Sequence, residues 1–359
     1  MASISKRDNG SWLARYRLTT RGAQKTKTFA RKVDAQTWLD GITASIMTSQ
    51  YIDPKAAKTT VRQYEKTWQA AQVTRPATRN NVDVALRLHV LPTIGDRPMG
   101  SVRPSDMQAL VKMLSATLSP GTVRETYKIA GRLFGAAVDD RILAASPCHR
   151  VRLPHDDRPE VVVPTVEQIT TLAGGVPARY RALVVLLAGS GLRIGEALGL
   201  GKSDVDFLRR TVKVERQRLP SGVIGPPKTP KSARTVPLGK VVVDELAAHL
   251  AKYPSEVALF TVPAGTPLGY SVWRHTWAKV NATAKVDVDT HQLRHFYASA
   301  LIAGGASVKV IQARLGHASA VITLDTYGHL WPDDDTLTRT VIDAAFGPLE
   351  YSLRTKSTL

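Results

Sequence analysis

The chain has 359 residues, of which 43% are hydrophobic, so it is long enough for two or three domains with ordinary apolar cores. Its formal net charge of +19 draws it toward polyanions, because each neutralised phosphate releases counterions. A nucleic acid is the leading partner, but charge alone does not separate it from a generically basic protein. Cys148 is the only cysteine, which excludes an intramolecular disulfide and a cysteine-rich metal site and fits a reducing compartment.

Neither a secretion signal nor a membrane span is predicted. The N-terminal residues carry charges where a signal peptide needs an apolar core. The most apolar run, residues 182–188, is far too short to cross a bilayer. We therefore expect a soluble intracellular protein that acts without a membrane.

Residues 1–55 are expected to form a small β-sheet backed by one helix. Trp12, Ala14 and Tyr16 alternate with Leu13 and Arg15, a glycine-containing turn follows, and the alternation resumes at residues 25–29. Helical spacing then covers residues 33–47. A basic sheet of this size fits a DNA major groove, although a merely solvated basic face is an equal alternative. The candidate DNA-binding residues here are Arg15, Arg17, Lys25 and Lys27.

Residues 59–150 read as helical throughout, in segments separated by proline and glycine. Ser105 and Ser119 are the expected helix N-caps, and the proline after Ser119 suits a first helical turn. The natural interpretation is a compact four-helix domain with one basic side, although helical bundles commonly carry some basic surface. Its candidate DNA-binding residues are Arg79, Arg124, Lys128 and Arg132.

Residues 151–164 contain prolines and runs of charge without a clear period, which is typical of an interdomain linker. A new unit starts at Thr165, which forms a predicted capping box with Gln168. The surplus of positive charge lies disproportionately in the first 153 residues. This distribution is expected if the N-terminal parts grip a long polyanion while the C-terminal part acts locally.

In the C-terminal half, residues 180–200 predict a buried helix, a glycine break and a second helix with Arg193 at its start. A buried arginine needs a partner, and a phosphate or Glu196 would serve. Residues 211–219 and 233–238 alternate like the strands of a β-hairpin that carries Lys228, Lys231 and Arg234 near its tip. Further helices are expected at residues 240–252 and 271–284.

Residues 291–331 gather several polar side chains. His291 and Arg294 lie three apart on one side of a predicted helix that ends at the Gly304–Gly305 pair. The next helix ends at Gly316, directly before His317, and Tyr327 falls on a separate helical element. A single histidine or tyrosine is usually a packing residue, so only the conjunction is informative.

Five motifs in this half resemble the catalytic domain of the tyrosine recombinases, specifically the phage integrases. They have that family's order and approximate spacing, and they are SGLRIGEAL at 190–198, PPKTPKSARTVPL at 226–238, HQLRH at 291–295, LGHAS at 315–319 and LDTYGHL at 324–330. One departure is Gln292, where many members have an acidic residue, but this position lies outside the reacting set.

The resemblance implies a multidomain fold. Its parts are a small N-terminal β-sheet plus helix, an all-α helical core-binding domain, and a mainly α catalytic domain with a small antiparallel β-sheet. The implied boundaries are 1–55 for an arm-type DNA-binding domain, 59–150 for the helical core-site DNA-binding domain, 151–164 for the linker, 165–345 for the catalytic domain and 346–359 for a C-terminal tail.

The resemblance also implies a role for each motif residue. Tyr327 would attack a DNA phosphate to give a 3′-phosphotyrosyl bond and a free 5′-hydroxyl. Arg193 and Arg294 would bind the non-bridging oxygens, work that other phosphoryl-transfer enzymes give partly to Mg²⁺, so no metal, cofactor or ATP is expected. The remaining implied roles are proton donation to the leaving oxygen by Lys228, assistance to the tyrosine proton transfer by His291, and a hydrogen bond to the phosphate from His317.

The expected function is site-specific recombination, which integrates or excises phage DNA at attachment sites through a Holliday junction in the cytoplasm of a bacterial host. Double-stranded DNA and three further copies of the chain are the implied partners, with a host DNA-bending protein and a directionality factor as additional candidates. Two rivals remain: a type IB topoisomerase, which religates the same strand, and a non-catalytic DNA-binding regulator. A short apolar helix at residues 337–346 would dock on a neighbouring protomer or on its own domain.

Overall fold

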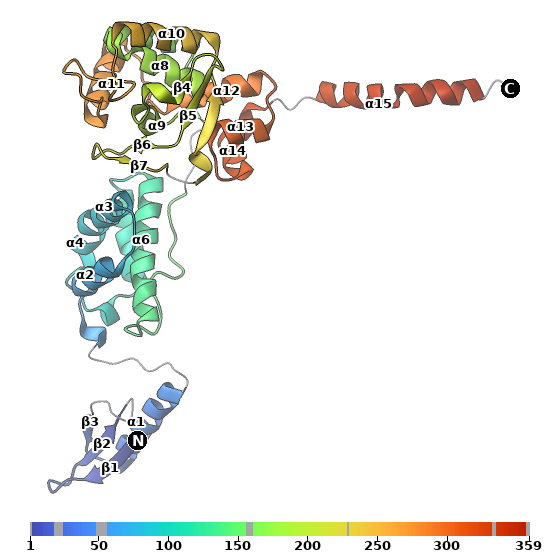
Figure 1. The fold of residues 1–359 in the computed structure, drawn as a ribbon. Coiled ribbons are helices and arrows are strands. Elements are labelled where there is room, and N and C mark those ends of the chain that lie inside the picture. Colours follow the sequence, from blue (N-terminus) through green and yellow to red (C-terminus); the bar gives the residue numbers. More distant parts are fainter. Residues whose placement is uncertain are drawn as a thin grey trace. The chain divides into compact units, whose positions relative to one another are not determined.

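The computed structural model describes residues 2–17, 24–47, 56–155, 161–227, 230–331 and 335–356 (Figure 1). The chain divides into two compact units, Met1–Arg158 and Pro159–Leu359, and the division falls inside the segment expected to be a linker. The described residues are mainly helical with small antiparallel sheets, as expected. Within these ranges, no helix combines the length and apolar character that a membrane crossing needs.

The first unit begins with a three-stranded antiparallel sheet and one helix. Its elements are β1 (Ala2–Lys6), β2 (Trp12–Tyr16), β3 (Lys25–Phe29) and α1 (Lys32–Met47). Ala14 and Tyr16 are buried against Ala35 and Leu39 of α1, so the alternation along β2 separates a helix-covered face from an open one, as predicted.

The rest of the first unit is helical and has its own apolar core. Its elements are η1 (Ala56–Lys58), α2 (Val61–Ala71), α3 (Pro76–Ala85), the π-helical turn η2 (Leu86–Val90), α4 (Leu91–Ile94), η3 (Met99–Ser101), α5 (Pro104–Ser115) and α6 (Pro120–Asp139). Ser119 caps α6 as predicted and accepts the backbone N–H of Thr122. The prediction for Ser105 is wrong, because α5 begins at Pro104 and Asp106 accepts the backbone N–H of Arg103 at 2.8 Å.

The second unit surrounds a buried central helix, α8 (Ala178–Ser190), which packs against α7, α10 and α12. Thr165 and Gln168 form the predicted capping box at the start of α7. The other helices are α7 (Val166–Gly175), α9 (Ile194–Leu198), η4 (Lys202–Asp204), η5 (Pro230–Ser232), α10 (Lys240–Lys252), α11 (Tyr270–Ala284), α12 (Gln292–Ala303), α13 (Val308–Leu315), α14 (Ala320–Tyr327), η6 (Gly328–Leu330) and α15 (Asp335–Lys356).

Two small antiparallel sheets complete the second unit. Strand β5 (Thr211–Val214) pairs with β4 (Val205–Asp206) and β8 (Arg234–Pro237), and β6 (Gln217–Arg218) pairs with β7 (Ile224–Gly225). The predicted hairpin is therefore present and carries an inner hairpin. Arg234 lies at the loop end of this hairpin, as expected, because it begins β8 and pairs with Val214, the last residue of β5; its side chain is buried.

Helix α15 presents an exposed apolar surface. Val341, Ile342 and Phe346 are each at least half exposed, at 55%, 50% and 57%. The expected division between a catalytic domain and a tail at residues 345/346 falls inside this helix.

Candidate active site

The first predicted catalytic residue, Arg193, is positioned by a glycine turn. Helix α8 ends at Ser190, and Gly191 adopts the left-handed conformation with φ +64° that redirects the chain into α9. Arg193 is the N-cap residue of α9, and its backbone N–H donates to Glu196 Oε2 at 2.9 Å. A Cβ at Gly191 would lie 2.4 Å from the Tyr297 ring, so this turn needs glycine for space as well as for conformation.

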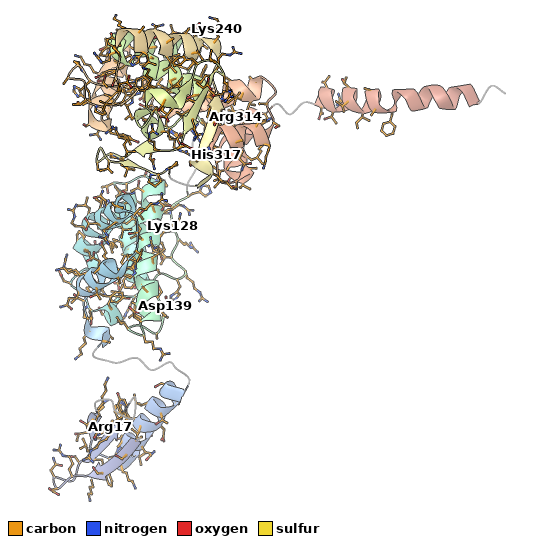
Figure 2. All side chains as sticks on the ribbon, in the orientation of Figure 1. Arg17, Lys128, Asp139, Lys240, Arg314 and His317 are labelled. Atoms are coloured by element: carbon orange, nitrogen blue, oxygen red, sulfur yellow. The ribbon has the colours of Figure 1, made fainter. Side chains whose placement is uncertain are left out.

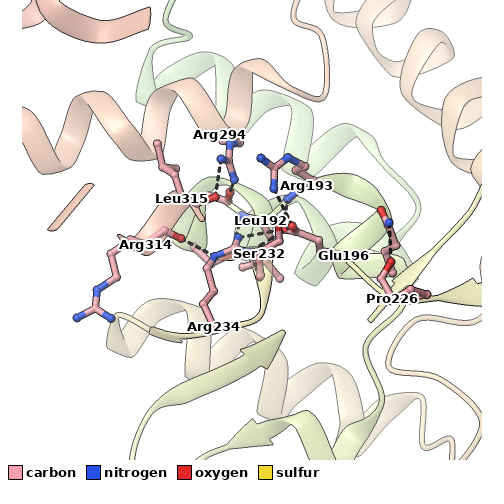
Figure 3. Close-up of polar contacts among 12 residues, drawn as sticks. Leu192, Arg193, Glu196, Pro226, Ser232, Arg234, Arg294, Arg314 and Leu315 are labelled. Carbon is pink, nitrogen blue, oxygen red and sulfur yellow. Dashed lines mark hydrogen bonds and ion pairs between the residues drawn. The ribbon is translucent and has the colours of Figure 1, made fainter. Parts of the chain in front are cut away.

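Glu196 anchors two arginines from distant elements. Arg193 Nη1 donates to Glu196 Oε1 at 2.9 Å, and Arg234 Nη2 donates to Glu196 Oε2 at 2.9 Å (Figure 3). Burial alone would raise the pKa of the Glu196 carboxyl, but the hydrogen bonds and charge of Arg234, with the charge of Arg193, hold this pKa below its ordinary value. Glu196, one of the two partners that the sequence offered for Arg193, is therefore in contact with it.

Arg294 lies at the buried centre of the site. Its side chain is 2% exposed, and it donates from Nη1 to the Gly191 carbonyl at 2.7 Å and from Nη2 to the Leu315 carbonyl at 2.6 Å. Burial and the nearby charge of Arg193 lower its pKa to about 9, so the guanidinium is still charged at neutral pH. Figure 3 shows the Arg193 and Arg294 side chains near each other, from the start of α9 and from α12.

Tyr327 ends α14, and its side chain is 1% exposed. Its ring lies parallel to the His317 ring, with centroids 6.5 Å apart, and His317 Nδ1 lies 2.9 Å from Thr323 Oγ1. Burial raises the pKa of the Tyr327 phenol to about 12, against the opposing charges of Arg294 and Arg193. An unassisted phenol in this setting is a weak nucleophile, so its proton needs an acceptor.

The side chain that reaches this phenol is His295, which the sequence interpretation did not assign. His295 Nδ1 lies 2.8 Å from Tyr327 Oη. His291, the residue expected to assist Tyr327, lies at the N-cap of α12, and its ring meets the His295 ring edge-on at 5.0 Å. The signal for His295 was present in HQLRH, because residues four apart share one face of a helix.

The remaining predicted catalytic residue, Lys228, lies outside the described residues. Its neighbour Lys231 donates from Nζ to the Ala318 carbonyl at 2.8 Å, directly after His317. Arg234 also reaches this region and donates from Nε to the Arg314 carbonyl at 2.7 Å. The loop end of the β5–β8 hairpin is therefore tied to the end of α13 and to the turn that carries His317.

Five of the six predicted catalytic residues thus gather in one place. The charges of Arg193 and Arg294 act on both His317 and Tyr327, and they lower the pKa of His317 to about 4 after the larger effect of its burial. Tyr297, the tyrosine not expected to react, is half-buried among apolar side chains of the core. The structure brings together Arg193, His291, Arg294, His317 and Tyr327.

The four DNA-binding candidates of the N-terminal sheet do not share one face. Arg15 lies opposite Thr26 on the open face, whereas Lys27 lies opposite Ala14 on the face that α1 covers. Lys27 Nζ stands 5.2 Å from the Phe29 ring centroid, which is a cation–π distance. Lys25 lies opposite the buried Tyr16, on the same side as Lys27, and Arg17 follows β2 and is exposed.

The four candidates of the helical part come from α3 and α6. Arg79 and Arg132 line one small pocket, where the Arg132 guanidinium lies 5.7 Å from the Trp68 ring centroid. Lys128 projects from α6 (Figure 2) and pairs with Glu125 at 2.6 Å. Arg124 donates to the Pro154 carbonyl at 3.1 Å, so it holds the segment after α6.

A cavity of about 710 Å³ lies between α7 and α11, and its lining includes His275 and Lys279. The five predicted catalytic residues that the structure describes do not line this cavity. Among the residues that the structure describes, no group of three or more His, Cys, Asp or Glu is placed to hold a metal ion.

Comparison with known proteins finds a family match over the part of the chain that contains these catalytic candidates. Residues 163–333 match the model of the phage integrase family. The integrase of Mycobacterium phage FRAT1 is 28% identical over 309 residues, which cover 80% of this chain and 91% of that protein. The tyrosine recombinase XerD of Mycobacterium leprae (strain TN) is 32% identical over 236 residues, which cover 61% of this chain and 71% of that protein.

Solved structures show the same fold. The Tn1549 transposon integrase in complex with transposon right end DNA matches with a TM-score of 0.67 at 21% identity, covering 80% of this chain and 99% of that chain. A lambda integrase tetramer bound to a Holliday junction matches with a TM-score of 0.59 at 16% identity, covering 88% and 96%. Fold, motif order and the identity to XerD over most of its length agree, and the chain belongs to the phage integrase family of tyrosine recombinases.

Proposed function

We propose that this protein is a site-specific DNA recombinase that integrates or excises phage DNA at attachment sites by cutting and rejoining strands. The observation that carries the proposal is the Tyr327 hydroxyl enclosed beside two guanidinium groups, those of Arg193 and Arg294. A phosphodiester between these arginines would have its non-bridging oxygens paired with positive charge, where charge develops in the transition state. The relatives named integrase and tyrosine recombinase support this reaction class.

The proposed cleavage step transfers a DNA phosphate from its 5′-oxygen to Tyr327. Tyr327 Oη attacks phosphorus and loses its proton, the bond from phosphorus to the 5′-oxygen breaks, and that oxygen takes a proton for which Lys228 is the proposed donor. The phosphotyrosyl bond keeps the energy of the phosphodiester, so a 5′-hydroxyl from a second duplex can attack it and release the tyrosine. No ATP enters this sequence, and two such exchanges pass through a Holliday junction.

The proposed division of labour along the chain uses the boundaries expected above. Residues 1–55 would bind arm-type DNA, residues 59–150 core-site DNA, and residues 165–345 would carry out the chemistry, with four protomers acting on two sites. The lambda integrase tetramer bound to a Holliday junction, which shares this fold, supports that assembly. The exposed apolar side chains of α15 fit a helix that docks on a neighbouring protomer. A host DNA-bending protein and a directionality factor remain candidate partners.

The test is covalent trapping. DNA that flanks the gene is incubated with the protein, adducts are captured in denaturant, and the trapped site is sequenced and rebuilt as a nicked suicide duplex. The Tyr327→Phe variant should bind this duplex and form no adduct, whereas Tyr297→Phe should still form it, because Tyr297 serves by packing. An undiminished adduct from Tyr327→Phe would overturn the assignment of the nucleophile.

Strand exchange separates the two rival functions. A recombinase joins strands of two attachment-site duplexes, whereas a type IB topoisomerase reseals only the strand it cut. A non-catalytic regulator would bind the site and trap no DNA. Joined products with recombined flanks are the expected result.

A further inference from the structure

The Tyr327 hydroxyl has a specific hydrogen-bond partner in the protein. Tyr327 Oη and His295 Nδ1 are 2.8 Å apart, and the two rings meet edge to face with centroids 5.5 Å apart. Such a distance is within the range over which a general base takes a proton directly. The contact joins the first turn of α12 to the last residue of α14, so it depends on the assembled fold.

The surroundings of His295 keep its imidazole neutral, so a ring nitrogen can accept a proton, although the same surroundings disfavour the imidazolium that results. The transfer therefore has to accompany formation of the bond from Oη to phosphorus. Burial is the largest cause, and the neighbouring His291 and the positive charge of Arg294 act in the same direction, while Asp289 opposes them; together they lower the pKa of His295 to about 4. At neutral pH the ring therefore carries one proton. With that proton on Nε2, Nδ1 has a free lone pair directed at Tyr327 Oη.

We propose that His295, rather than His291, is the catalytic residue that accepts the Tyr327 proton during strand cleavage and returns it during resealing. As the bond from Oη to phosphorus forms, the Oη proton moves to Nδ1. The electron pair of the breaking bond goes to the 5′-oxygen, which takes its own proton from a separate acid. Resealing runs the same transfers in reverse. This inference rests on the proposed recombinase function.

His291 is less well placed for the transfer. It keeps an exposed surface, and its ring contacts the edge of His295. Burial of its ring is the largest cause that lowers the pKa of His291, and the charges of Arg294 and Arg193 act in the same direction. These contacts place His291 beside the arginines that would bind phosphate, and so assign it to the phosphate side of the site.

The experiment measures single-turnover adduct formation on the nicked suicide duplex between pH 6 and 9, for the full chain and for His295→Ala, His295→Asn and His291→Ala. Loss of a general base slows such a step by about 10²-fold or more. His295→Ala should be slowed by that factor, and its rate should climb roughly tenfold per pH unit because the phenol must ionise beforehand. The unmodified protein should vary much less with pH. Added imidazole should partly restore His295→Ala.

His295→Asn separates proton transfer from positioning. Its side-chain oxygen can accept the Tyr327 hydrogen bond near the position of Nδ1, but an amide does not take the proton at these pH values. The inference predicts that this variant is as slow as His295→Ala, with the same rise in rate with pH. A rate equal to that of the unmodified protein would show that the contact only positions the tyrosine.

A duplex with sulfur in place of the bridging 5′-oxygen separates the two proton transfers. A thiolate leaves without a proton, so this substrate should rescue Lys228→Ala and leave both His295 variants slow. Rescue of the His295 variants would overturn the inference. The proposed function fails separately, since in that case the unmodified protein would trap no DNA. If His295→Ala does not fold, the pH profile and sulfur substrate still decide the question with His295→Asn.

Discussion

The Glu196–Arg234 ion pair should be the most sensitive polar contact of the catalytic unit. Their side chains are 2% and 6% exposed, and two hydrogen bonds of 2.9 and 3.2 Å join them. Glu196→Gln keeps the shape but turns an NH₂ group toward guanidinium donors and leaves two positive charges without their carboxylate. Removing one member of a buried pair costs about 3–5 kcal/mol. We expect a loss of that size in the free energy of unfolding.

The matched control is Asp244→Asn, which makes the same carboxylate-to-amide change in the exposed pair with Lys240. Surface pairs contribute about 0–1 kcal/mol, so this variant should change stability little. Hydrogen exchange of the full chain, read at the amides of α8 and α10, gives the free energy of opening of this unit in increasing urea. Equal losses for Glu196→Gln and Asp244→Asn would refute the reasoning.

Two further predictions use the same exchange measurement. Burial is the main cause that lowers the pKa of His249 in the folded protein. As the pH falls below the ordinary value near 6.5, the unfolded chain therefore takes up a proton that the folded chain does not, and the free energy of unfolding declines. His249→Gln can keep a donor to the Leu259 carbonyl at 3.0 Å and should make this free energy depend less on pH between 7.5 and 5; an unchanged pH dependence would count against this account. Gly191→Ala should destabilise the protein by roughly 1–3 kcal/mol, because of the backbone strain at φ +64° and the clash with Tyr297. Gly305→Ala is the control, since Gly305 has φ +77° and open space around it, so this variant should lose only the free energy of backbone strain. Equal losses of stability in the two variants would exclude a contribution from the clash.

Local signals in the sequence predicted the elements that carry the site. Gly191 and Gly316 were expected to end helices, and both adopt left-handed backbone conformations, two residues before Arg193 and directly before His317 respectively. The capping box at Thr165 was also predictable, because its two partners lie within one helical turn. These signals involve neighbours only, so the sequence displays them without knowledge of the tertiary fold.

What the sequence did not predict depends on contacts between distant segments. Arg234 was expected near a hairpin tip, yet it is buried because Glu196 and the Arg314 carbonyl supply its partners from other elements. Arg15 and Lys27 were both named as DNA-binding candidates of one basic sheet, but the register that places Lys27 opposite Ala14 puts it on the helix-covered face. Alternation along one strand predicts which of its residues share a face of the sheet. It does not determine the register of the neighbouring strand, which decides which residues of that strand lie on the same face.

The contacts of the site divide into a fixed frame and a closed nucleophile. Glu196 and Arg234 form a buried ion pair, and Arg294 donates to two backbone carbonyls. Displacing any of these side chains would leave a buried charge without its partner, which is costly. Tyr327 is 1% exposed, so a DNA phosphate can reach its hydroxyl only if this side chain moves. Within the part of the chain that the structure describes, that hydroxyl is hydrogen-bonded to His295.

Releasing Tyr327 costs about 0.5–1.5 kcal/mol for the hydrogen bond and about 1.5–3 kcal/mol for exposing its buried ring. The electrostatic free energy that a basic protein gains on DNA can offset such amounts. The bound and free states should therefore differ at α14 and the Tyr327 side chain, while the arginine frame stays in place. An enclosed tyrosine with a raised pKa reacts slowly with any phosphate that arrives alone. Coupling its exposure to the binding of DNA would confine strand cleavage to the assembled complex.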